Sequence, residues 1–572
     1  MQSLKGQLTL RSILIGCIGC VIITTASMYT ALKMGMLPWP ILFAAIVSLF
    51  FLKVFGKTNL SEVNVTHTVM TSGAMVAGGL AFTIPGIWIL GYPEDAVSWQ
   101  QMLIVALAGV VLGLICTAYL RKHFIEEAHL EFPLGEATSQ TLLAGNTGGA
   151  TGVKLFSAMG LAGIYTLVRD WFGALPVMLL NWVQIPGVAF GIYNSPMLLA
   201  IGFIVGTGAV VAWFIGALIG NFGIIVGGTA AGLWTTELGT QICSSLGMGL
   251  MMGCGVAVVL KVLFPVAKSF AGMKRKKGTE LVQPKGAPSP QADALTRFLA
   301  KKGLTAGIAA SLIAAVALVL CFALHLGPFA SIIIVIFAWI TTAMSAQSVG
   351  QTGIDPMEIF GLIVLLIVAA FSGTPQVQLF FVAGVIAVAC GLTGDIMNDF
   401  KAGHNLGTDP RGQWIAQLIG GLLGTGVAVA VLCVLVQAYG VGAFGLTETF
   451  VSTQATIVAT MISGIPCLPA FIIGLVVGAV LYFFRLPSMM IGLGVYLPFF
   501  LSLTAFLGVV VKFVYHFIGK RKRAKMSKEA AEEHQRAADE TGLVISSGVL
   551  GGESIAGVAI ALIIIGQLLV AS

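Results

Sequence analysis

Long apolar stretches recur along the whole chain, and this recurrence constrains the fold more than any other feature. A helix that crosses the hydrocarbon core of a bilayer needs about 20 apolar residues. The first half has apolar runs near 12–34, 38–55, 67–90, 101–120, 153–168, 174–193, 195–220 and 244–266. The second half has runs near 303–325, 328–347, 357–373, 378–400, 412–437, 468–483, 489–513 and 553–571. The sequence therefore predicts an all-α polytopic membrane protein with about 14–16 transmembrane helices.

The composition excludes other broad classes of protein. Hydrophobic residues make up 57% of the 572 residues and charged residues only 9%, where a soluble chain has about 25% charged residues. A soluble enzyme, a disordered scaffold and a nucleic-acid binder are excluded on this ground. We expect a lipid bilayer, and no nucleic acid, as the surroundings of this chain.

Proline and glycine interrupt many of the apolar runs, as at 35–38, 85–86 and 466–469. Non-helical backbone at membrane depth is tolerated only where protein or a water-filled cavity satisfies its polar groups. Two further segments, 133–146 and 449–463, are short and of mixed polarity, so we expect them to be re-entrant. The sequence thus predicts discontinuous helices around a cavity.

Most basic residues lie in a few polar stretches. Of the 30 Lys and Arg, 17 fall within Lys268–Lys302 and Lys512–Arg536, and the N-terminus carries Lys5 and Arg11. Basic loops beside apolar spans stay on the cytoplasmic side. We expect a multi-pass protein of the cytoplasmic (inner) membrane, with its N-terminus, a linker over 268–302 and a polar segment over 519–540 in the cytoplasm.

The two halves carry similar motifs in the same order. Ile23–Ala26 and Ile340–Ala343 both read ITTA, and Ser195–Met197 resembles Pro487–Met489. These matches predict a duplication, with one transmembrane repeat over 1–267 and a second over 303–572.

Loop charges indicate that these repeats have opposite orientations in the membrane. The loop at 91–100 is acidic, as expected outside, and its counterpart at 401–411 is basic, as expected inside. Inverted repeats with discontinuous helices are the architecture of secondary transporters, whose sites lie near the midplane.

Asp395 and Asp399 are the strongest candidates for chemistry, because an ionisable group at membrane depth is costly. Four residues apart, they share one face of a helix. Neighbouring carboxylates favour proton binding, so we assign both residues to proton coupling. In the alternative, Asp399 and Lys401 are solvated, or are paired with Arg411, at a helix end.

Seven residues are candidates for the substrate cavity: Glu136, Lys33, Tyr193, Asn194, Thr352, Asp355 and Lys401. Pro133 begins a short helix with Glu136 in its first turn, where the carboxylate could instead complement the helix dipole. Lys33 could pair with an anionic substrate or extend to the membrane surface. For Asp355, capping of a helix that begins at Pro356 is the favoured alternative.

The motifs of other protein classes are missing. The sequence has no GxxxxGK[ST] phosphate loop, no HExxH and no GxSxG, so we expect neither an ATP-driven pump nor an enzyme. We predict no cofactor and no metal site. The Cys17–Cys20 pair has no partner pair, and Met pairs such as Met251–Met252 are interpreted as core packing rather than soft-metal ligands.

Five segments resemble the oligopeptide transporter superfamily, which includes the yellow stripe-like metal-chelate transporters. They are Ala389–Asp395 (ACGLTGD), Asp399–Gly403 (DFKAG), Leu406–Arg411 (LGTDPR), Glu131–Ala137 (EFPLGEA) and Tyr29–Gly35 (YTALKMG). The resemblance covers nearly the whole chain, and the Asp395 segment is its most specific part. It implies about 16 membrane segments and proton-driven uptake of peptides or peptide-like chelates, and the length of the chain favours the prokaryotic and yellow stripe-like members.

The predicted function is proton-coupled uptake of short peptides or peptide-like compounds, with protons and a small-molecule or short-peptide substrate as partners. One alternative is transport of metal chelates of the siderophore or nicotianamine type, and a passive solute channel is another. The oligomeric state stays open, with a homodimer as one arrangement.

Overall fold

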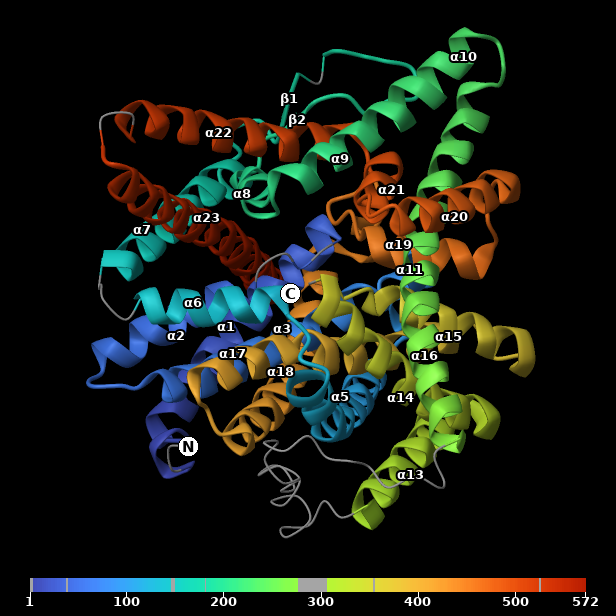
Figure 1. The fold of residues 1–572 in the computed structure, drawn as a ribbon. Helices are drawn as coiled ribbons and strands as arrows, with labels where there is room; N and C mark the ends of the chain where they lie inside the picture. The colour runs from blue at the N-terminus through green and yellow to red at the C-terminus, as the bar shows by residue number, and fades with distance from the viewer. Residues whose placement is uncertain are drawn as a thin grey trace.

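The computed structural model describes residues 4–35, 37, 40–145, 150–180, 182–275, 306–352, 355–523 and 526–571. Helices account for most of these residues (Figure 1). The first half contains α1 (Leu10–Met34), α2 (Pro40–Val54), α3 (Leu60–Ala81), α4 (Gly86–Ile89), α5 (Trp99–Arg121), α6 (Pro133–Gly145), α7 (Ala150–Thr166), α8 (Pro196–Ile204), α9 (Thr207–Ala217), α10 (Gly228–Ala230) and α11 (Thr236–Arg275).

The second half contains a similar series of helices. They are α13 (Ala306–Ala323), α14 (Gly327–Thr352), α15 (Met357–Ser372), α16 (Gln376–Gly394), α17 (Ile396–Leu406), α18 (Pro410–Tyr439), α19 (Thr453–Ser463), α20 (Leu468–Phe483), α21 (Ser488–Tyr496), α22 (Phe499–Arg523) and α23 (Lys528–Ala571). Most of the predicted linker lies outside the described residues, because only 268–275 are described, as the end of α11.

Nine helical stretches in the described part of the chain are long and apolar enough to cross a membrane. They are Leu10–Lys33, Leu60–Ile89, Trp99–Glu127, Thr207–Ala230, Gly327–Gly350, Gln376–Leu406, Pro410–Tyr439, Phe499–Lys520 and Ala530–Ile560. The expected multi-pass helical class is confirmed at this level. The higher number of 14–16 crossings stays a prediction.

The structure bears on the two segments expected to be re-entrant, 133–146 and 449–463, and on the apolar run at 174–193. Helices α6 and α19 have 13 and 11 residues, so at 1.5 Å per residue they are about 20 and 17 Å long, short of a bilayer core of about 30 Å. The apolar run at 174–193 is not a helix. Pro176 and Pro186, with Gly173 and Gly187 at positive φ, divide it into loops around a two-residue antiparallel ribbon, β1 (Met178–Leu179) and β2 (Ile192–Tyr193).

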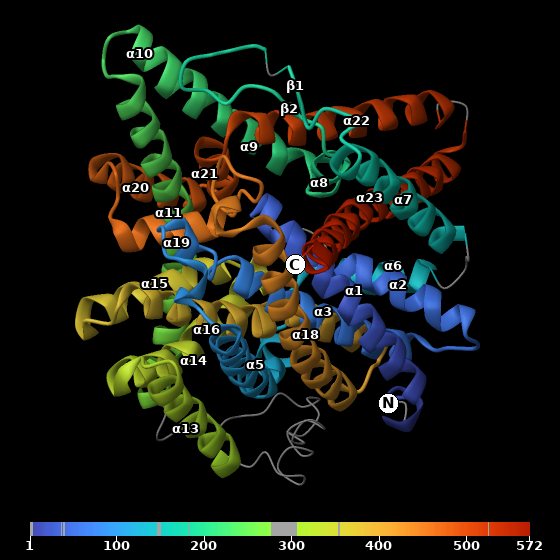
Figure 2. The same cartoon turned by 180° about the vertical axis from the view of Figure 1, so that it is seen from behind.

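Helices from the two halves form a common core. α3 packs against both α16 and α18 of the second half, and α5 packs against α16. Figures 1 and 2 show α3 (blue) and α18 (orange) side by side in opposite views. The core therefore cannot be divided into two separate domains along the chain.

One packing arrangement occurs twice with the halves exchanged. α7 packs on α23, and α20 packs on α11. In the first pair Gly552 lies against the carbonyl of Met159, and in the second pair Gly253 lies against the carbonyl of Leu475. Small residues at such crossings let helix backbones approach closely, which membrane helices use in place of a hydrophobic driving force.

A second pair of contacts repeats with equal spacing along the sequence. Gly202 of α8 lies against the carbonyl of Ala505 of α22, and Gly494 of α21 lies against the carbonyl of Trp213 of α9. The number of positions from Gly202 to Gly494 equals the number from Trp213 to Ala505. One sequence offset thus relates the two residues of the first contact to those of the second.

The crossing of α3 and α18 gives a prediction of stability. A side chain at Gly424 would overlap the backbone of Gly73, whereas nothing lies within 4 Å of a Cβ placed at Gly426, two positions further along α18. We expect Gly424→Val to lower the melting temperature of the detergent-solubilised protein, with a cost of at least ~1–3 kcal/mol from overpacking. Gly426→Val is the matched control and should melt near the wild type. Equal melting temperatures of the two variants would contradict this account.

Candidate functional site

One face of α3 carries a row of buried polar side chains. Asn64, His67, Thr68 and Thr71 are spaced three and four residues apart, so they lie on the same side of the helix. All four are fully buried. They face the segment of α17 that carries Asp399, which is also fully buried.

Asp399 lies among polar partners from two helices, α3 and α18. The Thr71 hydroxyl donates to its Oδ2 at 2.5 Å, and His67 Nε2 lies 3.7 Å from its Oδ1. The same His67 nitrogen lies 2.8 Å from the carbonyl oxygen of Ile41. The side-chain amide of Gln413 on α18 donates to the backbone carbonyl of Asp399 at 2.7 Å. The carboxyl group is thus held in the core, in contact with an imidazole.

The alternative environment proposed for Asp399 is wrong. Arg411 forms its ion pair with Asp409, which also caps the start of α18 by accepting from the Arg411 backbone N–H. Asp399 therefore neither pairs with Arg411 nor lies in solvent. Lys401 is half-buried and donates to the carbonyl oxygen of Leu130 at 3.1 Å.

Asp395 lies at the junction of α16 and α17, where the backbone stays helical. Because the backbone is helical from Asp395 to Asp399, the two residues, four apart, lie on the same side of it, as predicted. The Asp355 carboxylate lies beside this junction, since a Cβ at Gly394 would come within 2.8 Å of its Oδ2, and Glu358 is in α15, which packs on α16. Asp395 is half-buried. The carboxyl groups of Asp355, Glu358, Asp395 and Asp399 thus lie near the region where α15, α16 and α17 meet.

Asp355 does not cap a helix, contrary to the favoured expectation. The N-cap of α15 is Pro356, and no side chain caps this end. The carboxylate accepts instead from the Ser345 hydroxyl of α14 at 2.7 Å. Gly394 leaves the space for this contact, because a Cβ there would collide with the Ser345 hydroxyl. A tertiary hydrogen bond thus replaces the local cap.

Lys33 forms a second polar centre at the end of α1, which Gly35 terminates with φ of +66°. The lysine is 9% exposed, so it does not extend to the surface. Its Nζ donates to the hydroxyl of Tyr193 at 3.0 Å and lies 5.6 Å from the ring centres of Tyr193 and Phe450. Among the described residues, no carboxylate lies within 4.0 Å of this ammonium group. Two of the predicted substrate residues, Lys33 and Tyr193, are therefore in contact.

Asn194 has structural partners beside this centre. Its Oδ1 accepts from the Tyr165 hydroxyl at 2.6 Å, and its Nδ2 donates to the carbonyl oxygen of Pro176 at 2.9 Å. The apolar stretch is broken here, since Ser195 caps α8 and Pro196 is its first residue. These contacts fix the turn that carries Tyr193.

A buried ion pair holds the same turn, and the sequence reasoning missed it. Arg169 Nη2 donates to Glu553 Oε1 at 3.0 Å, and Arg169 Nη1 donates to the carbonyl oxygen of Asn194 at 2.5 Å. Glu553 also accepts from the Ser195 hydroxyl at 2.9 Å and from the backbone N–H of Met197 at 2.7 Å. Glu553 begins an apolar run, so the rule for ionisable groups at membrane depth could have found it.

The remaining predicted residues lie elsewhere. Glu136 is in the first turn of α6, as predicted, but it is exposed and accepts from the side-chain amide of Asn405 at 2.6 Å. Thr352 is the last residue of α14, and its side chain lies outside the described part. Glu136 and Lys401 thus belong to the contact between α6 and α17, which the Asn398 side chain extends by accepting from the Gly135 N–H at 3.1 Å.

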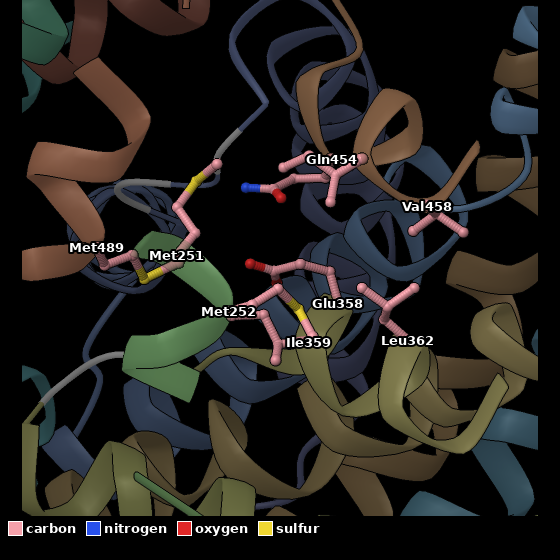
Figure 3. A pocket seen from close by; sticks show the side chains of 9 residues that line it. Met251, Met252, Glu358, Ile359, Leu362, Gln454, Val458 and Met489 are labelled. Carbon is pink, nitrogen blue, oxygen red and sulfur yellow. The ribbon is translucent and has the colours of Figure 1, made fainter. Parts of the chain in front are cut away.

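A small cavity adds a further carboxylate that the sequence reasoning missed. Glu358 of α15 and Gln454 of α19 point toward one another across it (Figure 3). The cavity volume is about 10 Å³, roughly the space for the centre of one water molecule. Its other lining residues are apolar: Met251, Met252, Ile359, Leu362, Ile457, Val458 and Met489. Among the residues described, no group of three or more His, Cys, Asp or Glu could hold a metal ion.

Membrane-length helices around buried charged groups define a multi-pass membrane protein with an ionisable centre. The family profile described as "OPT oligopeptide transporter protein" matches residues 7–564. The chain therefore belongs to the OPT oligopeptide transporter family, which confirms the predicted resemblance. It also confirms a transporter rather than an enzyme.

Two curated proteins align with nearly the whole chain. A Haemophilus influenzae protein named "Putative oligopeptide transporter" is 26% identical over 94% of this chain and 92% of its own length. An Oryza sativa protein named "Probable metal-nicotianamine transporter YSL12" is 20% identical over 96% of this chain and 86% of its own length. The "Metal-nicotianamine transporter YSL2" of Arabidopsis thaliana is 34% identical, but over 17% of this chain and 15% of its own.

The Arg169 ion pairs give a testable prediction. Glu553 is fully buried, whereas the Asp170 side chain, the second partner of Arg169, is 24% exposed. Removing one partner of a buried pair costs about 3–5 kcal/mol, and an exposed pair contributes about 0–1 kcal/mol. Since Arg169 keeps Asp170, we expect Glu553→Gln to cost about 2–4 kcal/mol and to lower the melting temperature in detergent clearly more than Asp170→Asn. Equal shifts in the two variants would count against Glu553 as the main anchor.

Proposed function

We propose that the chain is a secondary transporter that couples inward proton movement to uptake of short peptides or peptide-like compounds across the cytoplasmic membrane. The observation that carries the proposal is the fully buried carboxyl group of Asp399, in contact with His67 and Thr71. An ionisable group in this position is costly and is retained in proton relays. Membership of the transporter family supports the same conclusion.

Asp395 and Asp399 are the proposed proton-coupling residues. Asp399 is enclosed, while Asp395 is half-buried and lies among the carboxyl groups of Asp355 and Glu358. Burial and like charges both favour the neutral form of a carboxyl group. A proton that reaches Asp395 can therefore be passed on to Asp399, where the His67 imidazole is the next titratable partner.

The proposed substrate contact is the centre formed by Lys33 and Tyr193. A buried ammonium group without a carboxylate partner is costly, and an anionic group of a substrate would offset that cost. The carboxylate of a peptide has this chemistry. Metal chelates rich in carboxylates have it too, so a metal-chelate transporter is the second candidate, supported by the relative named as a metal-nicotianamine transporter.

The remaining candidates, Asn194, Thr352, Asp355, Glu136 and Lys401, are proposed to line or shape the route to this centre. The contact between α6 and α17 brings Glu136 close to Lys401 and to the helix of Asp399. A change at the proton site can thus reach α6 through α17.

The proposed coupling has a direct test in proteoliposomes. With an acidic outside, the wild type should accumulate a labelled tripeptide against its gradient, because proton entry drives uptake. Asp399→Asn cannot exchange a proton, so accumulation should fall at least tenfold while counterflow of peptide persists. Asp95→Asn, in an exposed loop, is the control. Unchanged accumulation by Asp399→Asn would remove Asp399 from the coupling step, and wild-type flux without accumulation would indicate a passive channel.

We further propose that the halves 1–267 and 303–572 are repeats inverted in the membrane. The equivalent packing of α7 on α23 and α20 on α11 supports the duplication. Basic residues support a cytoplasmic location for the N-terminus, for the linker 268–302 and for 519–540.

Inversion predicts opposite locations for corresponding loops. Asp95→Cys should react with a membrane-impermeant maleimide from outside the cell, because its acidic loop is expected to be external. His404→Cys, exposed in the last turn of α17 within the corresponding segment 401–411, should react only after the membrane is permeabilised. The wild type, with nine cysteines, gives the background labelling. Reaction of both positions from the same side would exclude the inversion.

A further inference from the structure

The cavity between Glu358 and Gln454 is lined by one carboxylate, that of Glu358, and by apolar side chains that include three methionines. Glu358 is 6% exposed, and no ion pair links it to a described basic side chain. Figure 3 shows its carboxylate and the Gln454 amide directed into the same space, with the methionines around it. The space for one water-sized group also fits a primary ammonium group, which has nearly the same size and donates hydrogen bonds. Methionine side chains adapt to ligands of different shape.

The proposed duplication relates this cavity to the Lys33 centre through α8 and α21. The backbone of Met197 and the hydroxyl of Ser195 donate to Glu553, at the start of α8. Met489, in the first turn of α21, follows Met197 at the same distance along the chain as Gly494 follows Gly202. Met489 lines the Glu358 cavity, and Met197 accepts from the hydroxyl of Thr30, one turn before Lys33 on α1.

One short segment of the second half connects the two sites. Phe450 packs its ring on the ammonium group of Lys33, and the Ser452 N–H donates to the carbonyl oxygen of Leu32 at 2.8 Å. Gln454 reaches the Glu358 cavity and donates to the carbonyl oxygen of Gly35 at 3.2 Å. The Cα atoms of Phe450 and Gln454 lie within about 14 Å of each other, the extended length of four residues.

The two sites are therefore close and carry opposite charges. A buried ammonium and a buried carboxylate each need a partner, and here each lacks an ion-pair partner among the described residues. A ligand with a carboxylate at one end and an ammonium at the other would satisfy both. A peptide of three or four residues has this chemistry and covers about 10–14 Å when extended.

We propose that the Glu358 cavity binds the free α-ammonium group of a zwitterionic peptide, with the peptide carboxylate at Lys33. The inference rests on the proposed peptide uptake for its choice of substrate. It assigns Glu358, Gln454 and the surrounding methionines to recognition of the amino end of the peptide. Peptides with a blocked amino group are then poor ligands, whatever their sequence.

Equilibrium binding to purified protein in detergent tests this assignment without a proton gradient. The probes are trialanine, N-acetyl-trialanine and trialanine amide. The wild type should bind trialanine at least tenfold more tightly than either blocked peptide. Glu358→Gln should bind trialanine and N-acetyl-trialanine alike, and still discriminate against the amide. Lys33→Gln should bind trialanine and trialanine amide alike, and still discriminate against N-acetyl-trialanine. Glu94→Gln, in an exposed loop, should behave as the wild type.

Glu358→Asp keeps the negative charge, so it should retain a preference for the peptide with a free amino group. That result would show that a loss of preference in Glu358→Gln comes from the lost charge and not from misfolding. Wild-type protein that binds N-acetyl-trialanine as tightly as trialanine, or binds neither, would overturn the inference. Retained discrimination by Glu358→Gln would also overturn it. Correct discrimination in binding, together with uptake that ignores a pH gradient, would leave the inference intact and contradict the proposed coupling instead.

Discussion

The cost of a charged group among apolar helices determines how this molecule is organised. Arg169 and Glu553 offset this cost by forming an ion pair, with a separation of 3.0 Å and almost no exposure of either side chain. Their spare hydrogen-bonding atoms are used by Asn194, Ser195 and Met197, so the start of α8 is tied to both. The pair keeps the turn before α8 in place, and Tyr193 in that turn holds Lys33. A fixed pair of charges thus supports an ammonium group for which the described residues supply no carboxylate within 4.0 Å.

Local features of the fold could be predicted from the sequence. Proline at the start of a helix is a local signal, and it correctly predicted the start of α6 at Pro133. The start of α8 has the same signal, with Ser195 as its cap and Pro196 as its first residue. Asp355 shows the limit of this reasoning. Its position before Pro356 favours a cap, but the Ser345 hydroxyl on another helix competes successfully for the carboxylate. Whether the Asp355 carboxylate caps α15 or accepts from Ser345 depends on tertiary distances, which the local sequence does not specify.

The candidate site was predictable residue by residue but not as an arrangement. Lys33 and Tyr193 were selected singly, and only the fold brings their side chains to 3.0 Å. Asp399 was selected for its charge, whereas its partner His67 lies in an apolar run of the first half and carries no distinguishing pattern of its own. Glu358 and Glu553 were available to the same rule as Asp399. They were missed because they stand at the ends of apolar runs, where a carboxylate resembles an ordinary loop residue.

The order of these contacts along the chain affects how the protein is made. Arg169, Tyr193 and Ser195 are synthesised long before Glu553, which lies on the last helix of the chain as described. Until α23 is inserted, Arg169 lacks this buried partner, and the start of α8 lacks two of its hydrogen-bond acceptors. Completion of the Lys33 centre is therefore a late step of biogenesis. In a chain stalled before α23, Arg169 would keep only Asp170, its partially exposed partner, and the turn before α8 would lack its buried anchor.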